Sequence, residues 1–166
     1  IRYPRWDGKR PKREVIRAFA EAINRDLRGN GIRVSADLFG LVFWAKGDLG
    51  IGQNLEDLAP HFDVLAPMVY PSHYARGFLE KQNPAAFPYE VISATLRRGS
   101  ERINALPLSQ RPVVRPWLQD FQLGAHYGVR EVQLEQRAAA ENGAAGWMLW
   151  NPLGRYTTGA LGKRPS

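Results

Sequence analysis

The sequence contains no cysteine, which excludes disulfide bonds, thiol nucleophiles and thiolate metal sites. Histidine is almost as scarce: three scattered residues with no paired spacing leave metal catalysis without a ligand set. A Gly-x-Gly-x-x-Gly fingerprint, a Walker-type loop and a Gly-x-Ser-x-Gly elbow are all absent. We therefore predict no cofactor and no metal, and look for chemistry among carboxylate, amide and aromatic side chains.

Long hydrophobic runs are missing too, which argues against a membrane-spanning segment. The chain opens Ile-Arg-Tyr-Pro, with no initiator Met and no signal-like apolar stretch. Its 166 residues, 44% hydrophobic and 23% charged, have the composition of one globular domain. We predict a single partial domain over residues 1–166, cut from a longer protein.

Acidic residues are fewer than basic residues. The 23 Lys and Arg residues against 16 Asp and Glu residues give a formal net charge of +7. Basic residues attract polyanions where they cluster, but only one dense run occurs, over residues 5–13, and the others are scattered along expected helices. We expect an ordinary solvated surface and no nucleic acid partner. Binding of nucleic acid or an anionic polymer stays open as an alternative, and it would weaken steeply with salt.

Four short apolar runs set the expected fold, and a polar loop and helical sequence follow each of the first three. Counted from Val34 to Val64, Val113 and Gly146 in turn, the steps are 30, 49 and 33 residues. A (β/α)8 barrel spends about 31 residues on each unit, so the middle step carries an insertion, which we place at 78–89. The runs predict parallel strands over 32–36, 64–70, 112–117 and 146–150.

Amphipathic spacing predicts helices in the intervening segments. The clearest one places apolar side chains at helical spacing over residues 13–28 and ends before Gly29, a typical C-cap. The sequence therefore predicts an α/β fold of parallel strands with outer helices. The other expected helices cover residues 54–59, 89–106 and 129–142.

Polar and aromatic residues stand where each apolar run stops, and the working residues of such barrels lie at the C-terminal ends of strands. Aromatic faces stack on sugar rings, while carboxylate, amide and imidazole groups bind hydroxyls. The rim therefore predicts a carbohydrate substrate. Its members are Asp37 after the first run, Tyr70, His73 and Tyr74 after the second, Trp117, Gln119 and Asp120 at the third, and Trp150 and Asn151 at the fourth.

Each rim residue also has a purely structural interpretation. Asp37 fits a cap of the following turn as well as a catalytic role, and His73 fits a structural hydrogen bond better than catalysis. For Asp120 a functional role is favoured, because burial of the aromatic and amide residues beside it would cost free energy without a functional reason. Trp150 faces the rim only if Trp147 does not, and the alternation leaves that open.

Five motifs occur in the order found in a known family: IRYP at 1–4, SADLFG at 35–40, APMVYPSHY at 66–74, RPWLQDF at 115–121 and GWMLWNP at 146–152. Together they resemble the "putative glycoside hydrolase domain" family, formerly a domain of unknown function, over nearly the whole chain. The resemblance implies the C-terminal half of a (β/α)8 TIM barrel, from the end of strand 4 through strand 8. The N-terminal half of the barrel would be absent.

The resemblance further implies a glycoside hydrolase that acts on a polysaccharide when full length. Two carboxyl groups flank the scissile bond in such enzymes, and we expect Asp37 to be one of them. Asp120 competes for the second role with a strand-4 acid outside this chain. The implied substrate contacts are Arg2, Tyr70, His73, Tyr74, Trp117, Gln119, Trp150 and Asn151.

A half barrel leaves sheet edges and an apolar interior open. We therefore expect this piece alone to be inactive, and to pair with the missing half or with itself. Family habit implies export from a bacterial cell. A non-catalytic carbohydrate-binding barrel stays open as the alternative, because it would keep the aromatic residues and use both aspartates only as hydrogen-bonding groups.

Overall fold

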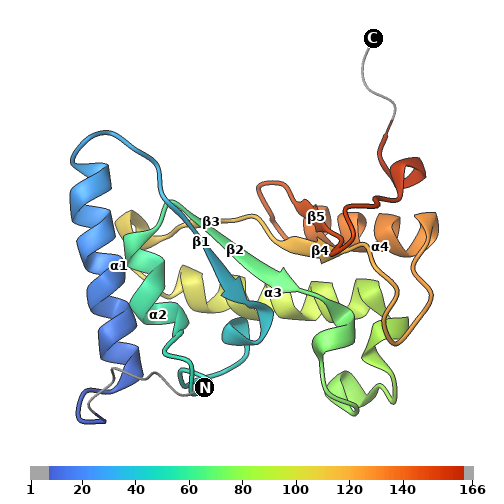
Figure 1. Cartoon of the computed structure of the whole chain (residues 1–166), viewed down its shortest axis with the longest axis horizontal. Helices are drawn as coiled ribbons and strands as arrows, with labels where there is room; N and C mark the ends of the chain where they lie inside the picture. The colour runs from blue at the N-terminus through green and yellow to red at the C-terminus, as the bar shows by residue number, and fades with distance from the viewer. Residues whose placement is uncertain (1–7, 163–166) are drawn as a thin grey trace.

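Short parallel strands form the sheet in the computed structural model, which describes residues 8–162 (Figure 1). β1 (Ser35–Phe39) pairs with β2 (Val64–Val69), β2 pairs with β4 (Trp117–Gln119), and β4 pairs with β5 (Met148–Trp150). β3 (Val113–Val114) pairs with the start of β2, so β3 and β4 lie one after the other alongside β2. The predicted α/β class with a parallel sheet is confirmed.

The break between β3 and β4 falls at Arg115 and Pro116. Proline has no N–H to give to a sheet ladder, but the chain stays in line: the Arg115 amide donates to the Leu65 carbonyl at 2.9 Å, and Pro116 accepts from the Met148 amide at 2.9 Å. The predicted single strand over 112–117 is therefore two short strands, and the second one continues to Gln119.

β1 begins three residues later than predicted, because a side chain takes the backbone amide that would have started it. The Asp63 carboxylate accepts a hydrogen bond from the Val34 amide at 2.8 Å and pairs with Arg28 at 2.7 Å. β1 also continues to Phe39, so Asp37 is the central residue of the strand rather than a residue beyond its end.

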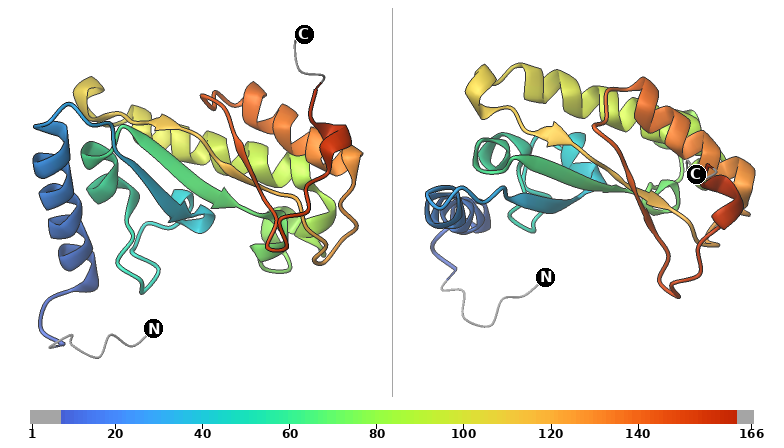
Figure 2. Two further views of the ribbon diagram at one scale, coloured as in Figure 1. Left: turned by 45° about the horizontal axis from the view of Figure 1, so that its top comes forward. Right: turned by 90° about the horizontal axis from the view of Figure 1, so that it is seen from above.

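Four α-helices confirm the predicted segments within two residues at each end, and α3 and α4 lie over one face of the sheet (Figure 2). None of the helices in residues 8–162 has the length and apolar character needed to cross a bilayer. The predicted insertion consists of two 3₁₀ turns before α3. The α-helices are α1 (Lys12–Arg28), α2 (Leu55–Leu58), α3 (Pro88–Asn104) and α4 (Val129–Glu141); the 3₁₀ turns are η1 (Gly40–Phe43), η2 (Ala59–His61), η3 (Pro71–His73), η4 (Phe78–Glu80), η5 (Pro84–Ala86), η6 (Leu108–Gln110) and η7 (Thr158–Ala160).

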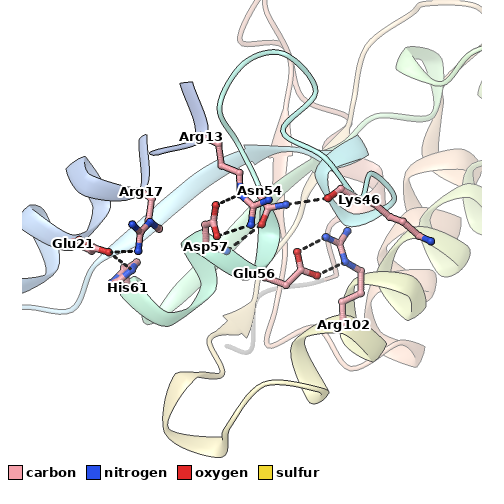
Figure 3. Close-up of polar contacts among 9 residues, drawn as sticks. All are labelled: Arg13, Arg17, Glu21, Lys46, Asn54, Glu56, Asp57, His61 and Arg102. Atoms are coloured by element: carbon pink, nitrogen blue, oxygen red, sulfur yellow. Dashed lines mark hydrogen bonds and ion pairs between the residues drawn. The ribbon is translucent and has the colours of Figure 1, made fainter. Parts of the chain in front are cut away.

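Ion pairs hold α2 between α1 and α3 (Figure 3). Arg13 of α1 pairs with Asp57, and Arg102 of α3 grips Glu56 through two hydrogen bonds of 2.7 and 2.6 Å. Asn54 caps α2 by accepting the Asp57 amide at 3.2 Å. Arg13 and Arg102 are therefore both paired with acidic side chains of α2.

The core lies between the sheet and the helices α3 and α4. Every second residue of each strand points into it, as the two-residue period of a strand requires. The opposite face of the sheet stays exposed at Asp37, Phe39 and Trp150. The inward row of the sheet comprises Leu38, Leu65, Val69 and Leu118, and the helical side contributes Val91, Ile92, Leu96, Ala138 and Ala139.

Gly99 allows α3 to approach η1 closely. A Cβ atom at Gly99 would lie 1.9 Å from a ring carbon of Phe43, which is fully buried. Alanine stabilises an open helix by about 1 kcal/mol relative to glycine, but here we expect Gly99→Ala to lower the free energy of unfolding by about 1–3 kcal/mol through overpacking. Urea unfolding measures it. Gly47→Ala, in open space, is the control, and a stabilised Gly99→Ala variant would contradict the packing argument.

Candidate active site

One face of the sheet brings together residues that the sequence placed at separate strand ends. Asp37 of β1 lies beside Ala66 of β2, and Met68, two residues further on, lies beside Trp117 of β4. Adjacent residues of parallel strands share a face, so these four point away from the core. Because Ala66 is small, the Trp117 indole reaches across β2, and its Nε1 donates a hydrogen bond to Asp37 Oδ1 at 2.9 Å.

The two tryptophans of the rim form an aromatic pair. Gln119 lies beside Trp150 in the register of β4 and β5, so Trp150 shares the face of Asp37 and Trp117, while Leu149 packs against the core. The rings of Trp117 and Trp150 meet edge to face, with centroids 6.1 Å apart, and Trp150 is 44% exposed. The structure thereby decides the orientation of Trp150 that alternation left open.

Tyr70 follows β2 and lies within the electrostatic range of Asp37. Burial raises the pKa of the Tyr70 phenol, and the Asp37 charge raises it further, so the hydroxyl stays neutral at physiological pH. A neutral phenol donates and accepts hydrogen bonds. Tyr70 therefore adds a polar group with an apolar body to the surroundings of Asp37.

His73 extends this aromatic group from the loop after β2. Its ring meets Tyr70 edge to face at a centroid distance of 5.2 Å, and Phe121 lies 5.5 Å from Tyr70. Partial burial lowers the pKa of His73, so its imidazole is neutral at pH 7. A neutral ring fits hydrogen bonding to a sugar hydroxyl, and it adds no charge next to Asp37.

Gln119 holds the loop that carries His73. Its Oε1 accepts hydrogen bonds from the Ser72 hydroxyl at 2.8 Å and the Ser72 amide at 3.2 Å, and its Nε2 donates to the Phe121 carbonyl at 3.0 Å. The side chain is fully buried. Gln119 thus positions the rim from within, and its predicted contact with substrate stays a prediction.

Asp120 and Asn151 anchor the segment that follows β5. The Asp120 carboxylate, 3% exposed, accepts the Thr157 amide at 2.7 Å and the Thr157 hydroxyl at 2.6 Å. Asn151 donates to the Asp120 carbonyl and accepts the Leu153 amide at 2.8 Å. The structure gives both residues internal partners, so Asp120 is not a second free carboxylate beside Asp37.

We expect Asp120→Ala to lower the free energy of unfolding by about 2–3 kcal/mol, since it strands the Thr157 amide and hydroxyl. Urea unfolding measures this, and faster proteolysis after β5 would localise it. Asp26→Ala, at an exposed position of α1, is the control. Thr157→Val should reproduce part of the loss. An Asp120→Ala variant as stable as the wild-type chain would show that the anchor contributes nothing.

One of the predicted substrate contacts is not brought to this face. Tyr74 is buried in the core, where its hydroxyl accepts a hydrogen bond from Thr95 of α3 at 3.0 Å and its ring lies 4.5 Å from Phe78. Burial raises the pKa of Tyr74. The expectation that Tyr74 lines the rim is corrected by this placement, and Arg2 lies outside the described residues.

Two other residues act electrostatically on the site and were missed in the sequence. Tyr156, 43% exposed in the segment after β5, acts electrostatically on Tyr70, as does Glu135 of α4. Glu135 interrupts the apolar stripe of α4 between Val132 and Ala138, which was the one signal for it in the sequence. Tyr156 stands in a polar loop with no comparable signal.

No group of three or more His, Cys, Asp or Glu side chains in residues 8–162 is arranged to hold a metal ion. A cavity of about 430 Å³ opens between the start of α3 and α4, lined by Phe87, Tyr89, Arg130 and Arg137 among others. None of the predicted rim residues lines it. We therefore take the open face of the sheet around Asp37, rather than this cavity, as the candidate site.

An exposed carboxylate and paired tryptophans therefore stand on the open face of a parallel α/β sheet, where aromatic surface and polar groups can contact a ligand together. Comparison with known families agrees: a sequence profile of the family described as "putative glycosyl hydrolase domain" matches residues 1–156. The chain belongs to this family. No curated protein sequence matches the chain at a significant level.

Proposed function

We propose that this chain is the C-terminal half of a (β/α)8-barrel glycoside hydrolase that acts on a polysaccharide. The observation that carries the proposal is the hydrogen bond between Trp117 and the exposed Asp37, beside the ring of Trp150. Tryptophan faces bind sugar rings, and an oriented carboxylate is the group that glycosidases use on the anomeric carbon. Family membership supports the same reaction class.

The half-barrel part of the proposal rests on the sheet edges. β1 and β5 end the strand order, and each pairs with one strand among the described residues. In a closed barrel every strand has two neighbours. Two further pairings, supplied by the other half of the barrel, would turn the face that carries Asp37 toward the barrel axis.

In this mechanism Asp37 acts through its second oxygen. Trp117 holds Oδ1, while Oδ2 accepts no hydrogen bond from the residues in 8–162 and belongs to an exposed side chain. Oδ2 would attack the anomeric carbon directly or remove a proton from an attacking water. Tyr70, as a neutral phenol, would hydrogen-bond the sugar next to it.

Hydrolysis needs a second carboxyl group as acid. Because both Asp120 oxygens are held by Thr157, we assign that role to an acid outside the described residues and keep Asp120 as the alternative. Among residues 8–162, Asp37 is the one carboxylate identified on this face with an oxygen open to a ligand, and this favours the second candidate function, a barrel that binds carbohydrate without hydrolysing it.

The test uses the full-length protein that contains this chain and a panel of plant, microbial and animal polysaccharides. Release of reducing ends supports hydrolysis, and binding without release supports the non-catalytic alternative. If no polysaccharide of the panel is bound or hydrolysed, both candidate functions are overturned. We expect Trp150→Ala to weaken binding of the recognised polysaccharide by about tenfold through loss of one stacking surface. Phe19→Ala, an exposed aromatic on α1, should leave binding unchanged.

A further inference from the structure

Glu135 is a buried acid with no partner. It lies on α4 in the face that packs inward, it is 0% exposed, and neither of its carboxyl oxygens makes a hydrogen bond within residues 8–162. The main-chain amide of Gln119 faces the Glu135 carboxyl group and lowers its pKa, which offsets part of the effect of burial. This amide nevertheless makes no hydrogen bond of normal geometry with Glu135. A leucine would fit this helical position at far lower cost.

The groups around Glu135 provide no compensating positive charge. Asp120, after β4, raises the pKa of Glu135 in addition to burial, and Glu135 acts in turn on Tyr70 after β2 and on Tyr127 before α4. Glu131, one turn earlier in α4, acts on Tyr127 as well. Among the described residues, no Lys, Arg or His contributes to the field at Glu135.

These neighbours connect Glu135 to groups that belong to the candidate site. Tyr70 belongs to the surroundings of Asp37, and Gln119 holds the loop that carries His73. A neutral carboxyl group can remain packed against the end of β4. An ionised one would need water, and water can reach it only if α4 and the end of β4 move apart.

We infer that Glu135 is a positioning residue of the proposed site, which keeps the end of β4 packed against α4 only as a neutral acid. The inference rests on the proposed function for its catalytic consequence, but its structural part does not. Burial without a cation partner raises the pKa of Glu135 well above the usual range of a glutamate, so the neutral form prevails at physiological pH. Ionisation at higher pH would loosen the aromatic group around Tyr70 before the chain unfolds.

The test compares the wild-type protein with Glu135→Gln, which keeps the shape and cannot ionise. Near-ultraviolet circular dichroism follows the aromatic groups between about pH 5 and 9, below the ordinary titration of tyrosine. We expect a change in the wild-type signal at alkaline pH and a flat signal in Glu135→Gln. Glu101→Gln, at an exposed position of α3, should behave as wild type. A change that survives in Glu135→Gln overturns the inference, and so does a flat wild-type signal in a protein that shows no infrared band of a protonated carboxylic acid at pH 7.

Two further measurements keep the outcome decisive. If Glu135→Gln fails to fold, the infrared band of a protonated carboxylic acid in the wild-type protein at pH 7 supports the inference, and its absence overturns it. On a polysaccharide that the full-length protein hydrolyses, the alkaline fall of turnover should move to higher pH in Glu135→Gln. Failure to hydrolyse any polysaccharide would refute the proposed function alone, because the spectroscopic comparison needs no substrate.

Discussion

Replacement of Asp37 by asparagine is expected to abolish polysaccharide hydrolysis and to leave the fold intact. Asparagine has the shape of aspartate and keeps a carbonyl oxygen that can accept the Trp117 indole hydrogen bond. It cannot act as nucleophile or base, and the loss of such a group typically costs about 10²–10⁴-fold in rate. The exposed position of Asp37 means that the change strands no buried group.

Turnover of the full-length protein on the polysaccharide identified by the panel is the measurement, with circular dichroism as the check on folding. Asp26→Asn, an exposed aspartate of α1, is the matched control and should retain full activity. Added formate or azide should restore part of the activity to Asp37→Ala if the carboxylate acts as a nucleophile. Undiminished turnover in Asp37→Asn would remove Asp37 from the mechanism.

Trp117→Phe separates the two contributions of this tryptophan. Phenylalanine keeps an aromatic surface beside Trp150 but has no N–H to donate to Asp37. A loss of turnover with unchanged polysaccharide binding would assign the hydrogen bond to the orientation of Asp37. Equal losses of turnover and of polysaccharide binding would assign Trp117 to stacking alone.

The order and type of the elements could be predicted because both follow from local pattern. Apolar runs, helical periodicity and the spacing between runs identify parallel βα units without knowledge of any long-range contact. Boundaries depend on single hydrogen bonds instead. The capture of the Val34 amide by Asp63 delays β1, and Pro116 divides the third run, although neither event disturbs the apolar pattern.

The site could be predicted only in part, because a strand end does not reveal the direction of a side chain. Adjacent residues point to opposite faces, so Gln119 and Asp120 cannot share an environment even though both stand at the end of β4. The pair of Asp37 and Trp117 depends on the register of three strands and on the small size of Ala66 between them. The burial of Tyr74 could not be predicted either, because an aromatic residue suits the rim and the core equally. In the structure Tyr74 points into the core, where its hydroxyl accepts a hydrogen bond from Thr95.

Glu135 escaped notice because helical periodicity treats a single charged residue in an apolar stripe as an irregularity. Its consequence for stability is nonetheless large. In the unfolded chain Glu135 ionises near its ordinary pKa of 4.5, whereas the folded chain keeps the proton to a much higher pH. Across that interval the folded state binds one more proton than the unfolded state, so stability falls as the pH rises, and it levels off above the folded-state pKa.

Glu135→Gln is therefore expected to be more stable than the wild-type chain at pH 7. Below about pH 4, Glu135 is neutral in both the folded and the unfolded chain, so the wild-type chain and Glu135→Gln should differ little in stability. Above that, the ratio of their unfolding constants should grow by about tenfold per pH unit until Glu135 ionises in the folded state. Urea unfolding at a series of pH values measures the ratio, and Glu101→Gln should show no such growth. A difference between Glu135→Gln and wild type that is independent of pH would mean that Glu135 is ionised in the fold, and that some group stabilises its charge.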